Sequence, residues 1–154
     1  MKEKIPGEWR SGCPINILLE TIGDTWSLLI VRDMMFLGRK TYNEFLNAGE
    51  KIATNILSDR LQRLESSGIV TKQRDPSDAR RHIYRLTEKG IDLAPVLIEM
   101  IVWAARHEET AAPPEIIRKM TEDREGFIAS VRSQWLTMQG RNVSDSAIEA
   151  NTED

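Results

Sequence analysis

The sequence predicts a mainly α-helical protein with one small β-hairpin. Apolar residues recur at helical spacing along most of the 154 residues. Two short β-prone runs interrupt this pattern and enclose a turn-rich, charged loop. A content of 40% hydrophobic and 29% charged residues is typical of a folded globular chain, so we expect one core with at most a short appendage.

Two helices are expected first. Pro14 suits the first position of a helix, where no backbone N–H is needed, and Gly23 ends that helix. Asp24 is the expected N-cap of a second helix that runs to Leu37. Apolar residues leave this second helix little polar face, which predicts a buried central helix.

The third and fourth helices are expected on either side of a tight turn. Thr41 followed three residues later by Glu44 is a capping-box pattern, and it predicts a helix over residues 42–48. A fourth helix is expected from about residue 53 to residue 66, with leucines at i, i+4 and i+7 and with Gly68 as the expected C-terminal glycine. Gly49, between the two helices, favours a tight turn.

The β-hairpin follows the fourth helix. Residues 69–74 and 82–86 are the expected strands, and residues 75–81 form a protruding loop. A long helix then begins at Thr87, and Pro95 is expected to kink it because a proline ring opposes the preceding helical turn. A last helical region starts at Pro113 and Pro114, with a break near Thr121.

This order of elements is that of a winged helix-turn-helix, in which the second helix of the turn enters the major groove of DNA. Helix 53–66 would bury its leucines and expose short polar groups that suit base edges. Basic residues around it would meet phosphates or a narrow minor groove. The expected DNA-binding residues are Arg39, Lys40, Lys51, Thr54, Asn55, Ser58, Asp59, Gln62, Arg63, Arg80 and Arg81.

The net charge of −3 is unevenly distributed along the chain. Residues 1–90 contain 15 lysines and arginines against 12 aspartates and glutamates, a net charge of +3. Residues 91–154 contain 6 against 12, a net charge of −6. This division indicates that only the first part of the chain faces a polyanion.

Several separate segments resemble the HxlR-type regulators, which are bacterial and archaeal relatives of the MarR-like winged-helix proteins. The resemblance spans residues 13–106 and implies a transcription regulator that binds an inverted repeat as a homodimer, with its terminal helices at the dimer interface. Thr25 stands where the family usually has a basic residue, and residues 77–81 replace a proline pair in the wing. The segments are Cys13-Pro14, residues 23–33 (GDTWSLLIVRD), residues 52–61 (IATNILSDRL) and residues 84–90 (YRLTEKG).

Four parts are therefore expected along the chain. Residues 1–24 form an N-terminal arm and helix for dimerisation, and residues 25–90 form the DNA-binding core. Residues 91–139 supply C-terminal helices for dimerisation. Residues 140–154 are small and polar, which predicts a disordered tail.

Other interpretations compete for the same residues. The exposed face of helix 53–66 is in the plainer view a solvated surface, since every amphipathic helix has one. Asp59 either accepts a hydrogen bond from a base amine or orients Arg63 or another basic neighbour, whereas Arg60 is expected in a structural ion pair. The alternative function is a winged-helix protein-interaction module without DNA activity. An enzyme is not expected, because the chain contains no recognisable phosphate loop, metal motif or nucleophile arrangement.

Cys13 is the candidate redox sensor. It is the only cysteine and lies at a helix N-terminus, where backbone dipoles favour a thiolate. Some HxlR-type regulators are similar in carrying a redox-sensing cysteine in the N-terminal segment. Packing of Cys13 as a small hydrophobe in the dimer arm is the favoured alternative.

No cofactor or metal is expected, since His82 and His107 lack metal-ligand spacing. An unknown small-molecule effector could be surrounded by Leu97, Met100, Trp103 and the apolar face of residues 116–135, but ordinary core or dimer packing explains these residues better. The chain shows no secretory signal and no apolar run near the ~18 residues of a membrane span. We therefore expect a cytoplasmic protein without a membrane partner.

Overall fold

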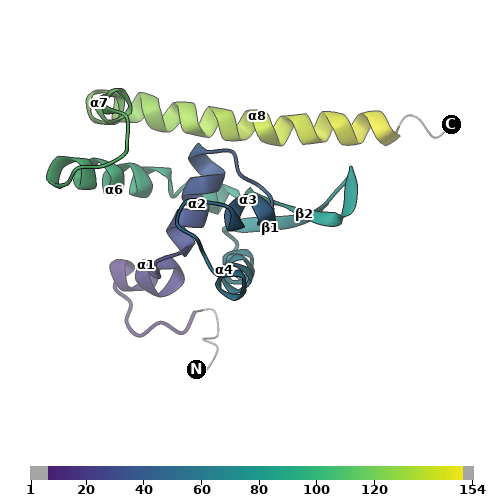
Figure 1. Ribbon diagram of the computed structural model, residues 1–154, viewed down its shortest axis with the longest axis horizontal. Helices are drawn as coiled ribbons and strands as arrows, with labels where there is room; N and C mark the ends of the chain where they lie inside the picture. The colour runs from purple at the N-terminus through teal and green to yellow at the C-terminus, as the bar shows by residue number, and fades with distance from the viewer. Residues whose placement is uncertain (1–6, 151–154) are drawn as a thin grey trace. The chain divides into compact units, whose positions relative to one another are not determined.

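The computed structural model describes the backbone of residues 7–150 and the side chains of residues 7–139. Helices and one two-stranded antiparallel sheet make up this part of the chain (Figure 1), which confirms the predicted fold class. The elements divide into two compact units, residues 1–92 and residues 93–154. In chain order the elements are α1 (Pro14–Ile22), α2 (Ser27–Phe36), α3 (Tyr42–Leu46), α4 (Thr54–Ser66), β1 (Val70–Asp75), β2 (Asp78–Leu86), α5 (Glu88–Ile91), α6 (Ala94–His107), α7 (Pro114–Glu122) and α8 (Arg124–Ala150).

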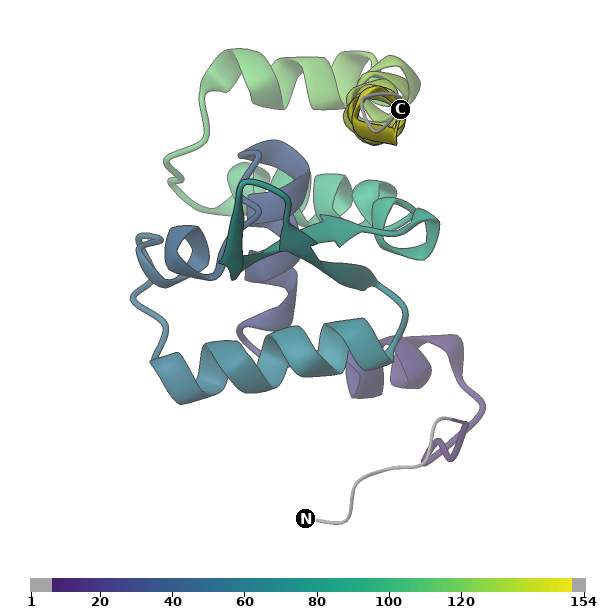
Figure 2. The same ribbon diagram turned by 90° about the vertical axis from the view of Figure 1, so that its right-hand side faces the viewer.

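Helices and the hairpin share one core in the first unit. α4 packs on α2, α3 and β1, while β2 packs on α2 and α5. Figure 2 shows α4 as the long blue helix below the hairpin. This packing is the winged helix-turn-helix that the sequence predicts. Its most deeply buried apolar side chains, each 2% exposed or less, include Ile22, Val31, Phe45, Leu57, Leu61 and Leu64.

The first two helices meet at Asp24. α1 has the predicted bounds, but α2 begins at Ser27, so the prediction that Asp24 is its N-cap is wrong. The Asp24 carboxylate still accepts hydrogen bonds from the backbone N–H groups of Trp26 and Ser27 and from Ser27 Oγ, at 2.5 to 3.1 Å. Asp24 therefore satisfies backbone donors at the start of α2 in the way an N-cap side chain does, although it lies three residues before the helix.

The helix-turn-helix has the local signals that the sequence predicts. Thr41 and Glu44 form the capping box at the start of α3. α4 ends before Gly68, whose φ of 73° lies in the left-handed region that glycine adopts without strain. Both helices therefore begin and end close to the predicted residues.

The hairpin is longer than predicted. Residues 75–81, expected as a loop, belong largely to β1 and β2, and only Pro76 and Ser77 lie between the strands. The pairing shifts register between Arg74 and Asp75. The sequence prediction missed this extension because the charged, turn-prone side chains of the segment have low strand propensity, whereas contacts with the rest of the hairpin decide its conformation. We call residues 70–86 the wing and residues 75–81 the wing tip.

The helix expected from Thr87 onward, with a kink at Pro95, is instead two helices. α5 ends at Ile91 and α6 begins at Ala94, so Pro95 lies in the first turn of a new helix. A proline in that position removes no intrahelical hydrogen bond, whereas a proline inside one long helix would. The prediction of one long helix kinked at Pro95 is therefore wrong.

The second unit consists of α6, α7 and α8, which contact one another in pairs. Met120 of α7 and Val131 of α8 are buried, and Arg124 of α8 forms an ion pair with Glu99 of α6. The break expected near Thr121 lies at Asp123, between α7 and α8. This unit thus has its own apolar contacts.

The expected tail, residues 140–154, overlaps the end of α8. The helical backbone of α8 continues to Ala150, and residues 151–154 lie outside the described part of the chain. Among the described helices, none alone is long and apolar enough to span a membrane. α1 and α2 reach the required length and composition only together, as a pair bent by 84°.

Candidate nucleic-acid interface

The outer face of α4 is polar and accessible. Leu57, Leu61 and Leu64 hold the opposite face in the core, with exposures of 0%, 2% and 1%. Helical periodicity then directs the remaining positions away from the core. All of the predicted residues of this face are exposed, namely Thr54, Asn55, Ser58, Asp59, Gln62 and Arg63.

Tyr42 of α3 supports the N-terminal end of α4. Its hydroxyl donates a hydrogen bond to the backbone oxygen of Thr54 at 3.0 Å and accepts one from Ser58 Oγ at 3.4 Å. These contacts link the two helices of the turn at the end where α4 is expected to meet bases. The sequence prediction missed Tyr42, because nothing in the spacing of residues 42–58 indicates a side-chain contact across the turn.

Arg60 is structural, as predicted. Its Nε lies 2.7 Å from Asp24 Oδ2, so it joins α4 to the segment before α2. Burial alone would raise the pKa of Asp24. Hydrogen bonds from Ser27, Arg60 and the Trp26 backbone together lower the pKa by more than burial raises it, so the pKa lies below its usual value. Arg60 also pairs with Asp59. Asp59 therefore orients Arg60, and the proposed i,i+4 pairing with Arg63 is wrong.

Arg39 is less available than the sequence suggests. Arg39 Nη1 lies 2.9 Å from Asp33 Oδ1, and the Asp33 side chain is only 4% exposed. Arg32 binds the same oxygen and also binds Glu50, whose pKa falls because it accepts from Arg32. Arg39 is therefore held in an ion-pair network, and Arg32 and Glu50 join a site where the sequence had not placed them.

Lys40 and Lys51 are exposed near the two ends of α3. The backbone oxygen of Lys40 accepts a hydrogen bond from Tyr84 N at 2.7 Å, which ties the start of the turn to β2. Tyr84 in turn meets Phe45 of α3 edge to face, with ring centroids 6.1 Å apart. Lys51 has a φ of 57°, an uncommon conformation for a lysine. Lys40 thus lies at a backbone position that a hydrogen bond ties to β2.

The wing presents more basic residues than were predicted. Figure 1 shows the hairpin extending away from α2, α3 and α4. Arg80 is 93% exposed, whereas Arg81 is 52% exposed and pairs with Asp75. Lys72 and Arg74 of β1 are exposed as well, and the sequence prediction missed them because it considered only the loop. Their alternation along the strand at period 2 was the available signal.

Cys13 is a free, exposed thiol immediately before α1. Its backbone oxygen accepts from Ile17 N, and its own N–H donates to Ser11 Oγ at 3.4 Å. In the described chain Cys13 is not buried as a small hydrophobe. The thiol is therefore accessible to solvent.

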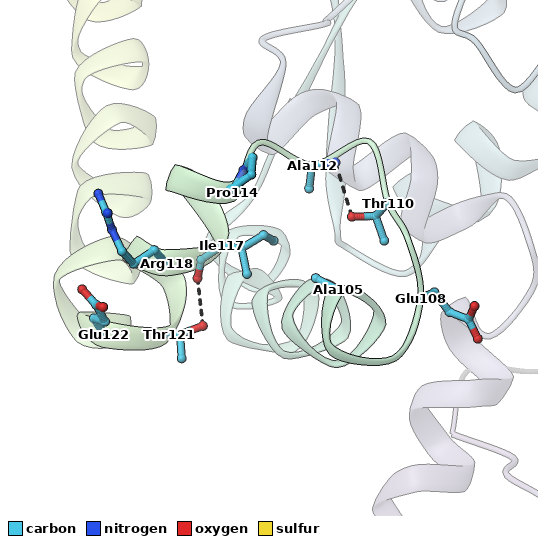
Figure 3. Close-up of a pocket in the computed structure, with 9 residues that line it drawn as sticks. All are labelled: Ala105, Glu108, Thr110, Ala112, Pro114, Ile117, Arg118, Thr121 and Glu122. Atoms are coloured by element: carbon cyan, nitrogen blue, oxygen red, sulfur yellow. Dashed lines mark hydrogen bonds between the residues drawn. The ribbon is translucent and has the colours of Figure 1, made fainter.

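Figure 3 shows a hollow in the second unit, and its volume is about 470 Å³. Ala105, Ile117 and Thr121 line it together with Arg118 and Glu122. The effector interpretation had named Leu97, Met100, Trp103 and residues 116–135. The structure separates them: Leu97 is buried, but Met100 and Trp103 are 50% and 63% exposed and do not line this hollow.

Among the described residues, no three His, Cys, Asp or Glu side chains are grouped so that they could hold a metal ion. His107 instead packs on Trp103, with ring centroids 5.1 Å apart. His82 lies in β2 opposite Arg74.

Comparison with known proteins places this geometry among transcription regulators. Residues 21–112 match the family model described as HxlR-like helix-turn-helix. The HTH-type transcriptional regulator YdeP of Bacillus subtilis is 30% identical over 108 residues, which cover 70% of this chain and 84% of YdeP. The family resemblance expected from the sequence is confirmed.

Solved structures agree with the family match. The structure of PA1607, proposed to be a transcription factor, has a TM-score of 0.60 and 35% identity, covering 68% of this chain and 71% of PA1607. The oxidised form of the redox regulator HypR has a TM-score of 0.56 and 29% identity, covering 64% of this chain and 100% of HypR. α7 and α8 lie beyond the family match.

Proposed function

The chain belongs to the HxlR-like helix-turn-helix family of transcription regulators, and from this premise we propose that it binds a specific double-stranded DNA sequence as a homodimer. Each subunit places α4 in a major groove and the wing against the adjoining backbone. The operator is an inverted repeat, because two-fold symmetry of the protein requires two-fold symmetry of the site.

The observation that carries this proposal is the division of α4 into two faces. Three leucines hold it in the core, and short hydrogen-bonding side chains cover the outer face at its N-terminal end. Asn55 can donate to and accept from one adenine edge, and Gln62 carries the same amide group about two helical turns further along. These side chains would provide sequence specificity.

Affinity would come from the basic residues around α4. Lys40, Lys51 and Arg63 are exposed, and so is Arg80 at the wing tip. Lysines and arginines at such positions neutralise phosphates and release counterions. Arg80 can also enter a narrow minor groove beside the site of α4.

Apolar residues left exposed on terminal elements support the homodimer. Ile15 and Leu19 lie on one face of α1 and are 70% and 56% exposed. In the second unit, Met100 and Trp103 of α6 are 50% and 63% exposed. Burial of such side chains against a second copy would stabilise a dimer and set its half-sites about one helical turn, ~34 Å, apart.

A titration of the purified protein against duplex DNA from upstream of its own gene, at several salt concentrations, tests this proposal. We expect high affinity for one sequence and a log–log salt slope of about −0.9 per phosphate neutralised. No binding to any genomic fragment, even at low salt, would instead favour the winged-helix protein-interaction module. Retained binding with no preference among sequences would contradict the assigned role of α4.

Redox control through Cys13 is a second candidate, favoured by the exposure of its thiol and by the similarity to a protein named as a redox regulator. Peroxide would take one hydrogen from the Cys13 thiol of each of two subunits, form water and leave a disulfide between them. We expect altered DNA affinity after peroxide treatment of the wild type and none in Cys13→Ser. Unchanged affinity and no disulfide-linked dimer would exclude this control.

A further inference from the structure

The wing tip contains more residues on one strand than on the other. Asp75 pairs with Asp78, and the neighbouring Arg74 pairs with His82. Three residues of β2 therefore fall between two adjacent pairs, and the ladder itself does not position them. They are Ala79, Arg80 and Arg81.

Asp75 closes this irregular segment from the opposite strand. Its side chain is 5% exposed and uses both oxygens. Oδ1 accepts from Ser77 N at 2.9 Å and from Ser77 Oγ at 2.7 Å, and Oδ2 accepts from Arg81 Nε at 2.7 Å and from Arg81 Nη2. The hydrogen bonds from Ser77, and then that from Arg81, hold the pKa of Asp75 well below its usual value, so the carboxylate is charged at neutral pH.

Arg80 has a different environment from its neighbour. It is 93% exposed, and its contact with Asp78, at 3.3 Å, joins two solvent-exposed groups. An exposed pair of this kind restrains a side chain little. Arg81 instead makes two charge-assisted hydrogen bonds to a buried carboxylate, the stronger type of contact.

We infer that Asp75, Ser77 and Arg81 form a latch that fixes the shape of the wing tip and thereby directs Arg80 toward DNA. This inference rests on the proposed function of the wing. Arg81, predicted from the sequence as a DNA contact, is on this view a positioning residue that acts through Arg80. Asp75 assists DNA binding although it carries the same charge sign as DNA.

Asp75→Ala distinguishes the latch from a simple effect of charge, because the two predict opposite changes in DNA affinity. Removal of a carboxylate beside a polyanion should tighten binding if charge alone matters. Loss of the latch should weaken binding at about 0.1 M salt by roughly threefold or more. Ser77→Ala leaves the charge unchanged and removes one hydrogen bond, so it should weaken binding to a smaller extent.

Double substitutions then identify the residue through which the latch acts. Arg80→Ala should weaken binding to all sequences and reduce the salt slope by about 1. Asp75→Ala or Arg81→Ala should add little in an Arg80→Ala background, because the residue that they position is already gone. A direct DNA contact by Arg81 would instead make Arg80→Ala and Arg81→Ala additive.

The experiment is an anisotropy titration of these full-length variants on the operator and on an unrelated duplex, with Glu65→Gln on α4 as the control for loss of one exposed carboxylate. Amide exchange of Ser77 in the absence of DNA should be faster in Asp75→Ala, which reports the latch itself. Tighter binding by Asp75→Ala, or additive effects of Arg80→Ala and Arg81→Ala, would overturn the latch. Failure of the wild type to bind any DNA would overturn the proposed function first.

Discussion

At the scale of single residues, neighbours of like charge have different roles. Arg60 and Arg63 lie on the same helix, but Arg60 bridges Asp24 and Asp59 whereas Arg63 is exposed. A helical projection predicted the inward direction of Arg60. The ion-pair partners of such residues depend on which carboxylates the fold brings near. The spacing of residues along the sequence does not show this, because Asp24 and Arg60 lie on different elements.

Substitution of Asn55 tests the reading face of α4. Asn55→Ala removes an exposed amide without disturbing the buried leucines, so stability should be unchanged. Operator affinity should fall by about 1 to 3 kcal/mol, while affinity for unrelated DNA stays the same. Competition titrations with both duplexes measure this difference. An equal loss on both duplexes would show that Asn55 contributes no specificity.

Asp24 predicts a pH dependence of stability. Its folded-state pKa lies below the unfolded value, so its contribution to the free energy of unfolding is complete above the unfolded pKa of ~3.9 and decreases as the pH falls through the folded pKa. Asp24→Asn should therefore be less stable than the wild type at neutral pH, and this difference should narrow below about pH 4. Urea unfolding from pH 3 to pH 7 measures it. A constant difference across this range would contradict the ionic role of Asp24.

At the scale of elements, local signals succeeded where a helix end depends on nearby residues. The capping box at Thr41 and the glycine at position 68 predicted the limits of α3 and α4 closely. The wing tip and Pro95 were predicted wrongly for one shared reason. The conformation of the wing tip, and the separation of α5 from α6, are decided by contacts that propensity does not contain.

Gly90 in α5 provides a test of this packing. A Cβ atom at Gly90 would lie 2.3 Å from the backbone oxygen of Ile69, and a backbone atom there cannot move aside cheaply. Gly90→Ala should lower the free energy of unfolding by about 1 to 3 kcal/mol. Gly49→Ala is the matched control, since a Cβ at Gly49 meets no atom within 4 Å. Equal stabilities of the two variants in urea would contradict the close approach.

At the scale of the whole molecule, charge follows the two units. The boundary between them, at residues 92 and 93, falls close to the point where the sequence changes from a net charge of +3 to one of −6. The basic unit contains the helix-turn-helix and the wing. This correspondence explains how a protein of net charge −3 can approach DNA through one part of its surface.

The proposed homodimer leads to a prediction about exposed apolar residues. Ile15→Glu combined with Leu19→Glu should convert the protein to monomers, since charges on this face of α1 oppose its burial. Leu37→Glu is the matched control, because Leu37 is 55% exposed but lies outside α1. Sedimentation velocity distinguishes the two forms. A dimer that survives the α1 substitutions would place the interface elsewhere.

Protection of guanine N7 on the operator tests the central claim most directly, because this atom lies in the major groove. If α4 enters the groove, dimethyl sulfate footprinting should show two protected clusters whose centres are about one helical turn, ~34 Å, apart or a small multiple of it. Asn55→Ala should lose protection within these clusters. If saturating protein left the dimethyl sulfate reactivity of every operator guanine unchanged, the account would be contradicted.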